Sequence, residues 1–273
     1  MLMRCSTHKV ETMNENAQSS GDQPKVLILT PVKNAERYLA RYVELIEALD
    51  WPASRLSLGM LDSDSKDGTE ARLYELEARM RKCADRVTLK KRDFGFHMPD
   101  AIPRWAPAFQ VARRTVLARA RNHLLFAALD NEDWVLWIDV DIVDYPPDAI
   151  QRLLAAERDI LQPHCVLEHG GPTFDQNGWI DHGKRTLHDM RGSSDPVRMD
   201  SVGGSMLFVR ADLHRDGLVF PPYKYGVESN AIRDPHPLWG KGEIETEGLA
   251  MMARDMGHQC WGLPDFEILH HSS

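Results

Sequence analysis

The sequence predicts an α/β fold, with one Rossmann-like α/β/α domain built on a central, mostly parallel sheet. Short runs of consecutive apolar residues, expected of strands buried on both faces, alternate with longer segments whose apolar residues recur every three or four positions. The loops that follow these runs are rich in Asp, Ser, Pro and Gly. The length of 273 residues, 42% of them hydrophobic, is enough for one domain with a sizeable core.

The bulk properties exclude several classes of protein. Residues 1–24 are polar and are predicted to be a disordered tail, which leaves residues 25–273 for the domain. No window reaches the 18 or more apolar residues of a membrane span, and the start is unlike a signal peptide, so we expect a cytoplasmic or otherwise soluble protein. The net charge of −8 and the lack of a basic run argue against a nucleic-acid partner. Four scattered cysteines indicate neither a zinc site nor a disulfide framework.

The first third of the chain reads as strands and helices in alternation. Strands are predicted at 26–29, 56–61 and 87–89, and helices from Ala35 and from Glu70 to about Lys82. The loop at 62–69 is dense in Asp and Ser, which either cap the following helix or accept hydrogen bonds from a nucleoside. No Gly-rich dinucleotide fingerprint or P-loop is present.

A long helix is predicted from Ala108 to Leu129, and it carries several arginines. Arg114 and Arg121 lie seven residues apart and therefore on nearly the same face, where they could point at phosphate or substrate. The alternative is a solvated basic face.

Two carboxylates follow a run of five consecutive apolar residues. Residues 134–138, Trp-Val-Leu-Trp-Ile, read as a buried strand, and Asp139 and Asp141 come directly after it. In an extended chain, side chains two residues apart point the same way, and such a pair at the carboxyl end of a strand can hold Mg²⁺ or Mn²⁺ against a diphosphate. The alternative is that both acids are solvated or cap the next turn.

The second half is predicted to add a helix at 147–157, strands at 159–163, 206–209 and 266–269, and a helix from Glu243 to about Met256. Residues 168–198 form a long irregular excursion, of the kind that is often functional. Gly203 and Gly204 allow a ligand or another backbone to approach closely. His270, at the end of the last strand, can complete a metal site if it emerges beside the two aspartates. Four other histidines are expected at the surface, namely His164, His169, His182 and His188.

Several motifs occur in an order that resembles one family. They are Leu-Thr-Pro-Val-Lys-Asn (29–34), Ser-Asp-Ser-Lys-Asp-Gly-Thr (63–69), Lys-Arg-Asp-Phe-Gly (91–95), Arg-Ala-Arg-Asn-His-Leu-Leu (119–125), the stretch 134–143, Asp-Ser-Val-Gly-Gly-Ser (200–205), His-Arg-Asp-Gly-Leu-Val-Phe-Pro-Pro (214–222) and Glu-Thr-Glu-Gly-Leu-Ala (245–250). Together they resemble the glycosyltransferases of family 62, the mannosyltransferases of the fungal Golgi mannan polymerase. The resemblance covers residues 25–271.

This resemblance implies a GT-A fold, a GDP-α-mannose donor, Mn²⁺ (with Mg²⁺ left open), and transfer to a glycan or mannoside acceptor with retention of configuration. Asp139, Asp141 and His270 would bind the metal, with His271 as an alternative ligand. Arg121 and Arg114 would face the diphosphate, and Glu245 and Glu247 the acceptor or the transferred sugar. The implied donor-binding residues are Thr30, Pro31, Lys33, Asp62, Asp64, Asp139, Gly203 and Gly204.

The sequence also departs from the fungal members, which carry a membrane anchor. No such segment is present, so a soluble relative that acts on a different acceptor is expected rather than a protein of the Golgi lumen. Self-association into a homo-oligomer stays open.

Two other functions remain as alternatives. A haloacid-dehalogenase-type phosphatase also places Asp-x-Asp after a buried strand, but on the first strand and with a different continuation. A non-catalytic nucleotide-sugar-binding partner subunit would keep the pocket without turnover.

Overall fold

The computed structural model describes residues 23–99, 102–103, 106–227 and 242–272, and it confirms the α/β fold class. The predicted tail therefore lies outside the described residues, except for residues 23 and 24. In the described part of the chain, no helix combines the length and the apolar character needed to cross a membrane.

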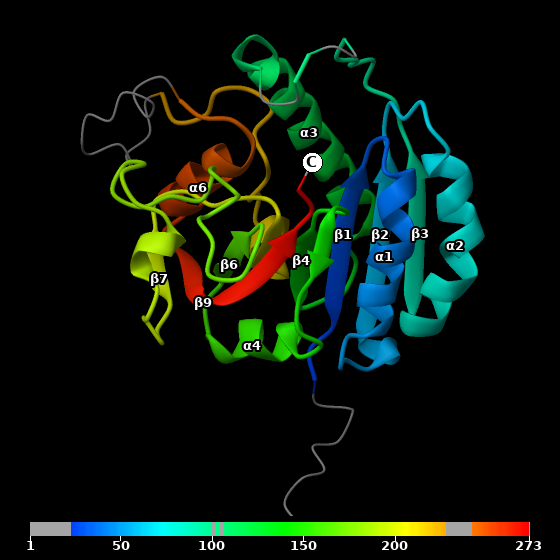
Figure 1. The fold of residues 1–273 in the computed structure, drawn as a ribbon, viewed down its shortest axis with the longest axis horizontal. Helices are drawn as coiled ribbons and strands as arrows, with labels where there is room; N and C mark the ends of the chain where they lie inside the picture. The colour runs from blue at the N-terminus through cyan, green and yellow to red at the C-terminus, as the bar shows by residue number, and fades with distance from the viewer. Residues whose placement is uncertain (1–22, 100–101, 104–105, 228–241, 273) are drawn as a thin grey trace, which may run out of the picture.

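One half of the sheet is parallel (Figure 1). Its strands run in the order β3-β2-β1-β4, and Val26 of β1 lies opposite Leu56 of β2 on one side and Trp134 of β4 on the other. The bounds are β1 Val26–Val32, β2 Leu56–Asp62, β3 Arg86–Lys91 and β4 Trp134–Ile138. Because parallel strands end at the same edge, the loops after β1, β2 and β4 all meet there.

The other half of the sheet is mixed. It continues from β4 in the order β8-β6-β9-β5, with β7 paired to β9, and only β6 and β9 run parallel to each other. The bounds are β5 Ile142–Asp144, β6 Ile160–Val166, β7 Val197–Met199, β8 Met206–Arg210 and β9 Cys260–His270. The last strand, β9, crosses the molecule toward the edge where β1 and β4 end (Figure 1).

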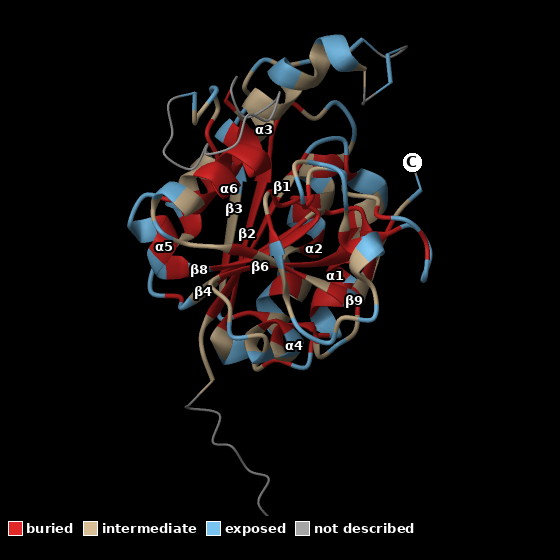
Figure 2. Ribbon diagram, turned by 90° about the vertical axis from the view of Figure 1, so that its left-hand side faces the viewer, coloured by how far each residue is buried: buried red, intermediate tan, exposed pale blue. Residues whose placement is uncertain are grey.

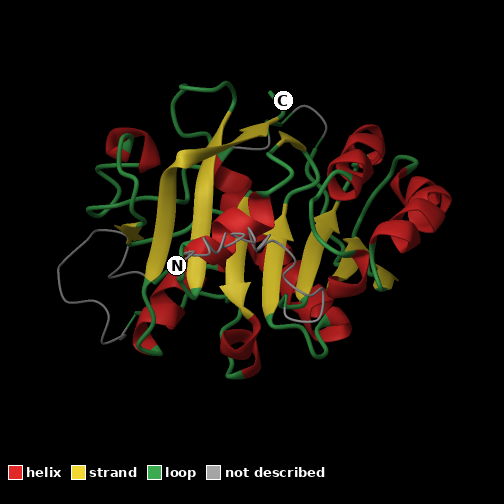
Figure 3. Cartoon of the chain, turned by 90° about the horizontal axis from the view of Figure 1, so that it is seen from below, coloured by secondary structure: helices red, strands yellow, loops and turns green. Residues whose placement is uncertain are grey.

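Helices cover both faces of the sheet (Figure 3). Val26 and Ile28 of β1 pack with helices α1, α2 and α4 on one face, whereas Leu27 and Leu29 pack with α3, α5 and α6 on the other. The bounds are α1 Glu36–Glu47, α2 Thr69–Cys83, α3 Pro107–Ala128, α4 Ala149–Ala155, α5 Ala211–Arg215 and α6 Glu245–Asp255, with short 3₁₀ turns at Ala53–Arg55 and Leu187–Met190. Both faces of the central strands are thus buried (Figure 2), which explains their unbroken apolar runs.

The structure corrects several expectations. Strands β5 and β7 and helix α5 were not predicted, because elements of three to five residues are too short to show a period. The final strand spans eleven residues rather than four, since Pro264 lies in an irregularity of the β6–β9 pairing. His164 is fully buried on β6, not at the surface; its Nε2 lies 2.8 Å from the hydroxyl of Thr173. Burial lowers the pKa of His164 to about 4.

Candidate active site

The two aspartates lie in a tight turn between β4 and β5. The amide of Ile142 donates to the carbonyl of Asp139 (3.2 Å), so the extended geometry expected for this stretch is wrong. The two carboxylates nevertheless lie close together, as expected, because the turn brings them together. Strand β5 pairs with β9 so that Ile142 lies opposite His270. One ligand atom from each of Asp139, Asp141 and His270 lies within 4.8 Å of the others.

His270 presents one ring nitrogen to the acids. Its Nε2 lies 3.2 Å from Oδ1 of Asp141, and its Nδ1 lies 2.8 Å from the carbonyl of His271, which fixes the ring. Burial alone would lower the pKa of His270, but the hydrogen bond to Asp141 and the charge of that residue raise it above its ordinary value. The ring of His271 instead packs edge-on against Tyr38, with centroids 5.2 Å apart. Of the two histidines, His270 is therefore the one that joins the acidic group.

These three side chains suit a divalent cation. Burial raises the pKa of Asp139 to about 6, the positive charge of Arg121 opposes this rise, and the neighbouring Asp141 adds to it. A bound cation would relieve the repulsion between the two carboxylates. Carboxylate oxygens suit both Mg²⁺ and Mn²⁺, and the added imidazole favours the transition metal.

Arg121 of α3 connects helix α6 to the turn that holds Asp139 and Asp141, called the acidic turn below. Its guanidinium lies 3.2 Å from Oδ1 of Asp139 and 3.4 Å from Oε1 of Glu245, and it donates to the carbonyl of Gly204 (3.3 Å). The side chain is 2% exposed and lies over the rings of Trp137 and Phe220.

Arg114, two turns earlier on the same face of α3, contacts the same helix. Its Nη1 lies 2.7 Å from Glu247, and its Nη2 donates to the carbonyl of Ile244 (2.8 Å) and lies 3.8 Å from Glu245. The indole of Trp179 also donates to Glu247 (3.1 Å). The predicted common face of Arg114 and Arg121 is thus confirmed, and a solvated basic face is excluded for both.

Glu245 holds an unusual backbone conformation. It is the first residue of α6, and its φ of 60° lies in the left-handed region that a glutamate rarely adopts. It is 2% exposed, and the hydroxyl of Thr246 donates to its carboxylate (2.8 Å). The contacts with Arg114 and Arg121 offset this strain, which is typical of functional positions.

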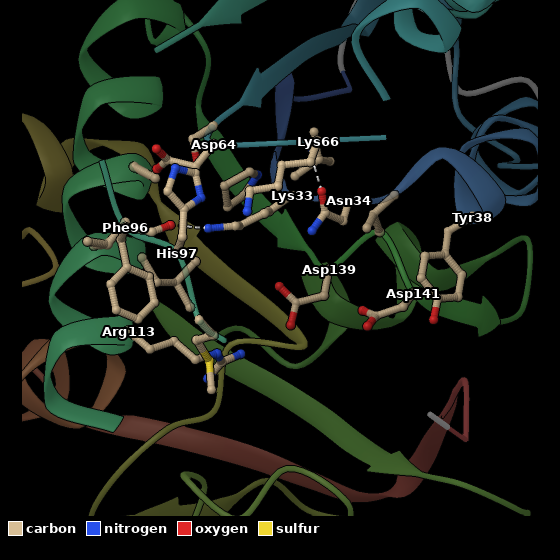
Figure 4. Close-up of a pocket in the computed structure, with 18 of the residues that line it drawn as sticks. Lys33, Asn34, Tyr38, Asp64, Lys66, Phe96, His97, Arg113, Asp139 and Asp141 are labelled. Atoms are coloured by element: carbon tan, nitrogen blue, oxygen red, sulfur yellow. Dashed lines mark hydrogen bonds between the residues drawn. The ribbon is translucent and has the colours of Figure 1, made fainter. Parts of the chain in front are cut away.

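Two cavities meet at the acidic turn. The first, of about 400 Å³, opens toward the loops after β1 and β2 (Figure 4). The second, of about 440 Å³, lies toward α6 and the excursion after β6. Both are lined by Asp139, Asp141, Arg113 and Leu117. The acidic turn therefore forms part of a wall that the two spaces share.

Four of the predicted donor-binding residues line the first cavity, namely Pro31, Lys33, Asp64 and Asp139. The ammonium of Lys33 donates to the carbonyl of Phe96, and burial lowers its pKa (Figure 4). Asp64 accepts the amides of Phe94 (3.0 Å) and Gly95 (2.8 Å), so its carboxylate ties two loops at the cavity together.

The other four predicted donor residues do not line this cavity. The hydroxyl of Thr30 is buried and donates to the carbonyl of Ile138 (2.8 Å). Asp62 is 1% exposed, and the ammonium of Lys91 lies 3.8 Å from its Oδ2. Burial raises the pKa of this carboxylate, and the charge of Lys91 opposes the rise. Gly204 lines the second cavity, and Gly203 lines neither.

Several residues that line the cavities were not among the predicted site residues. In the first they are Asn34, Arg37, Tyr38, Lys66, His97 and Arg113, and in the second Gln110, Asp175, Gln176 and Asn177. Arg113 stands beside the predicted Arg114, and the last three belong to the excursion, whose lack of periodicity hides which of its side chains point inward.

The fold is that of the GT-A glycosyltransferases. Among solved structures, the chain is similar to the mannosyltransferase PcManGT from Pyrobaculum calidifontis in complex with GDP-Man and Mn²⁺, with a TM-score of 0.56 and 16% identity. That match covers 94% of this chain and 59% of the other, so the chain spans about three-fifths of that protein. A haloacid-dehalogenase-type phosphatase has no support from this fold.

The chain belongs to the Anp1 family, whose sequence model matches residues 4–192 and 186–224. This confirms the resemblance to the fungal mannan polymerase type. It is 29% identical to the mannan polymerase complex subunit mnn9 of Schizosaccharomyces pombe, over 98% of this chain and 87% of that protein. It is 26% identical to the mannan polymerase complex subunit MNN9 of Candida albicans, over 98% of this chain and 80% of that protein.

Proposed function

We propose that this chain is a metal-dependent, retaining α-mannosyltransferase that moves mannose from GDP-mannose to a hydroxyl of a glycan or another acceptor. One observation carries the proposal. The group Asp139, Asp141 and His270 lies where two cavities meet, so a metal there would touch a donor in one cavity and its transferred sugar at the entrance to the other.

The first cavity suits a nucleoside diphosphate. Lys33, Arg37, Lys66 and Arg113 supply positive charge around it, and Pro31 and Asp64 border the part nearer β1 and β2. Thr30 and Asp62 are buried beside Pro31 and Asp64, and they would hold this part of the cavity wall in place. The bound GDP-Man and Mn²⁺ of the similar mannosyltransferase support the donor and the metal. Such a metal, Mn²⁺ or Mg²⁺, would neutralise charge on the departing diphosphate.

The second cavity suits the acceptor and the transferred sugar. Glu245 and the amides of Gln110, Gln176 and Asn177 line it, and such groups bind sugar hydroxyls. Arg114 and Arg121 also line it and would stabilise charge on the diphosphate side of the breaking bond. Glu247 does not line the cavity; it would act by holding Arg114.

Retention requires either a protein nucleophile or attack from the same face as the leaving group. Asp139, Asp141 and His270 are called the metal group below. Two further carboxylates line the second cavity, and both are bound by protein partners. Glu245 contacts Arg114, Arg121 and Thr246, and Asp175 accepts several hydrogen bonds from Gly204 and Ser205. This arrangement supports same-face attack, with the departing phosphate taking the proton of the acceptor hydroxyl.

The test is a transfer assay with GDP-mannose, Mn²⁺ and a panel of mannosides, in which GDP release and the anomeric configuration of the product are measured. We expect α-linked product that disappears when the metal is chelated. A product of inverted configuration, or transfer that survives chelation, would contradict the proposal. The Asp144→Asn variant is the matched control for substitutions of Asp139 and Asp141, because the side chain of Asp144 is 49% exposed at the end of β5 and pairs with Arg41.

A second candidate is a non-catalytic subunit that binds the nucleotide sugar. The relatives named as subunits of mannan polymerase complexes favour it. Binding of GDP and Mn²⁺ without GDP release or transfer to any mannoside would identify this function.

A further inference from the structure

One carboxylate outside the metal group is held unusually firmly beside it. Asp175 belongs to the irregular excursion after β6 and lines the second cavity. Its Oδ2 accepts three hydrogen bonds, from the amides of Gly204 (2.8 Å) and Ser205 (3.0 Å) and from the hydroxyl of Ser205 (2.9 Å). Its Oδ1 accepts the amide of Asn177 (3.2 Å). Oδ2 is therefore bound by the turn at residues 203–205, and Oδ1 by the amide of Asn177.

That turn is shaped to receive the carboxylate. A Cβ atom on Gly203 would lie 2.0 Å from Oδ2 of Asp175, so only glycine at this position leaves room for the side chain. The amide of Gly203 in turn donates to Oε1 of Gln162 on β6 (2.6 Å). Both contacts fix the turn before β8 begins.

The opposite side of the same turn holds the proposed active site. The carbonyl of Gly204 accepts from Arg121 (3.3 Å), and the carbonyl of Ser205 accepts the amide of Asp139 (2.9 Å). The Gly204–Ser205 peptide is planar, with its N–H and C=O pointing in opposite directions. Asp175 thus holds one end of this peptide and Arg121 contacts the other.

We propose that Asp175 is a positioning residue of the glycosyl-transfer site, which sets the places of Asp139 and Arg121 through the Gly203–Ser205 turn. This inference rests on the proposed function, because those two residues matter only if metal and diphosphate bind beside them. The packing of the adjacent Phe174 supports it, since its ring stacks on the imidazole of His270 with centroids 4.1 Å apart. One short segment thus contacts both the turn and the third member of the metal group.

The test measures ligand binding rather than activity. Mn²⁺ affinity is followed by electron paramagnetic resonance and GDP affinity by calorimetry, for the wild type and for Asp175→Ala, Asp175→Asn and Ser205→Ala. We expect Asp175→Ala to weaken Mn²⁺ binding by about 10- to 100-fold, as is usual when a residue that orients metal ligands is removed. Asp175→Asn, which keeps one acceptor oxygen, falls between Asp175→Ala and the wild type. Ser205→Ala loses one hydrogen bond and weakens binding by roughly two- to tenfold.

Controls separate positioning from folding. Asp181→Asn changes an exposed carboxylate of the same excursion, which pairs with Arg185, and leaves both affinities unchanged. If Asp175→Ala does not fold, Ser205→Ala alone decides the question. A folded Asp175→Ala or Ser205→Ala protein with wild-type affinities, and only a lower unfolding temperature, would overturn the inference. A wild-type protein that binds neither Mn²⁺ nor GDP would overturn the proposed function together with it.

Discussion

The guanidinium of Arg121 lies 3.2 Å from a carboxylate oxygen of Asp139, and this contact joins helix α3 to the turn that follows β4. Arg121 is the more buried partner, since its side chain is 2% exposed and that of Asp139 is 32% exposed. Its charge also lies 3.4 Å from the buried Glu245. One cation therefore compensates two acids that come from different elements.

We predict that Arg121→Ala destabilises the protein by about 3–5 kcal/mol, because removing one partner leaves buried charge without compensation. Arg121→Lys retains the charge but cannot reach all three partners, and costs less. The free energy of unfolding in urea measures both effects. Arg119→Ala, on the exposed side of the same helix, is the control; it removes a contact with the ring of Phe94 and should cost no more than about 1 kcal/mol. An Arg121→Ala protein as stable as this control would refute the assigned role.

Changes in the metal group should abolish the response to metal without unfolding the chain. We expect Mn²⁺ to raise the melting temperature of the wild type in the presence of GDP, because ligands that bind only the folded state stabilise it. Asp139→Asn and Asp141→Asn should each remove this shift, whereas Asp144→Asn should keep it. A manganese-dependent shift of wild-type size in the Asp141→Asn protein would place the ion elsewhere.

The close approach of Gly203 to Asp175 predicts an interaction that a double-mutant cycle can measure. Gly203→Ala should cost about 1–3 kcal/mol of stability, since its Cβ would lie 2.0 Å from the carboxylate and force both groups apart. In an Asp175→Ala background the clash is gone, so the same substitution should cost much less. Equal costs in the two backgrounds would mean that the clash is with other atoms.

Buried histidines predict a loss of stability in acid. Burial lowers the pKa of His214 to about 4, from an ordinary value of 6.5. The neutral ring accepts from the indole of Trp137 through Nε2 (3.4 Å), and its Nδ1 lies 2.6 Å from the carbonyl of Leu218. The unfolded chain takes up a proton near pH 6.5, whereas the folded chain does so only near pH 4. The stability from this group is therefore complete above pH 6.5 and lost as the pH falls toward 4.

The size of this effect can be measured by urea unfolding between pH 7 and pH 4. The shift in pKa corresponds to roughly 3 kcal/mol for His214. His214→Gln keeps a donor and an acceptor but does not titrate, so its stability should fall less steeply over this range. His164, whose pKa burial also lowers to about 4, should account for part of the slope that remains. An unchanged slope in His214→Gln would show that this ring does not titrate as described.

The central strands and the acidic pair could be predicted because their signals are local. Five consecutive apolar residues before Asp139 indicate a buried strand, and the pairing of β4 with β1 confirms it. The burial of Arg121 could not be predicted in this way, since it depends on Asp139 and Glu245, which are distant in the sequence. Asp175 was missed for the same reason, because its partners lie about 30 residues away in an irregular region.

The most direct measurement is the anomalous scattering of manganese in crystals of the protein grown with GDP and Mn²⁺. We predict a peak in contact with Asp139, Asp141 and Nε2 of His270, with the diphosphate against the same ion and the nucleoside in the cavity beside Lys33 and Asp64. A manganese peak elsewhere, or GDP bound without any ion at this group, would contradict the account.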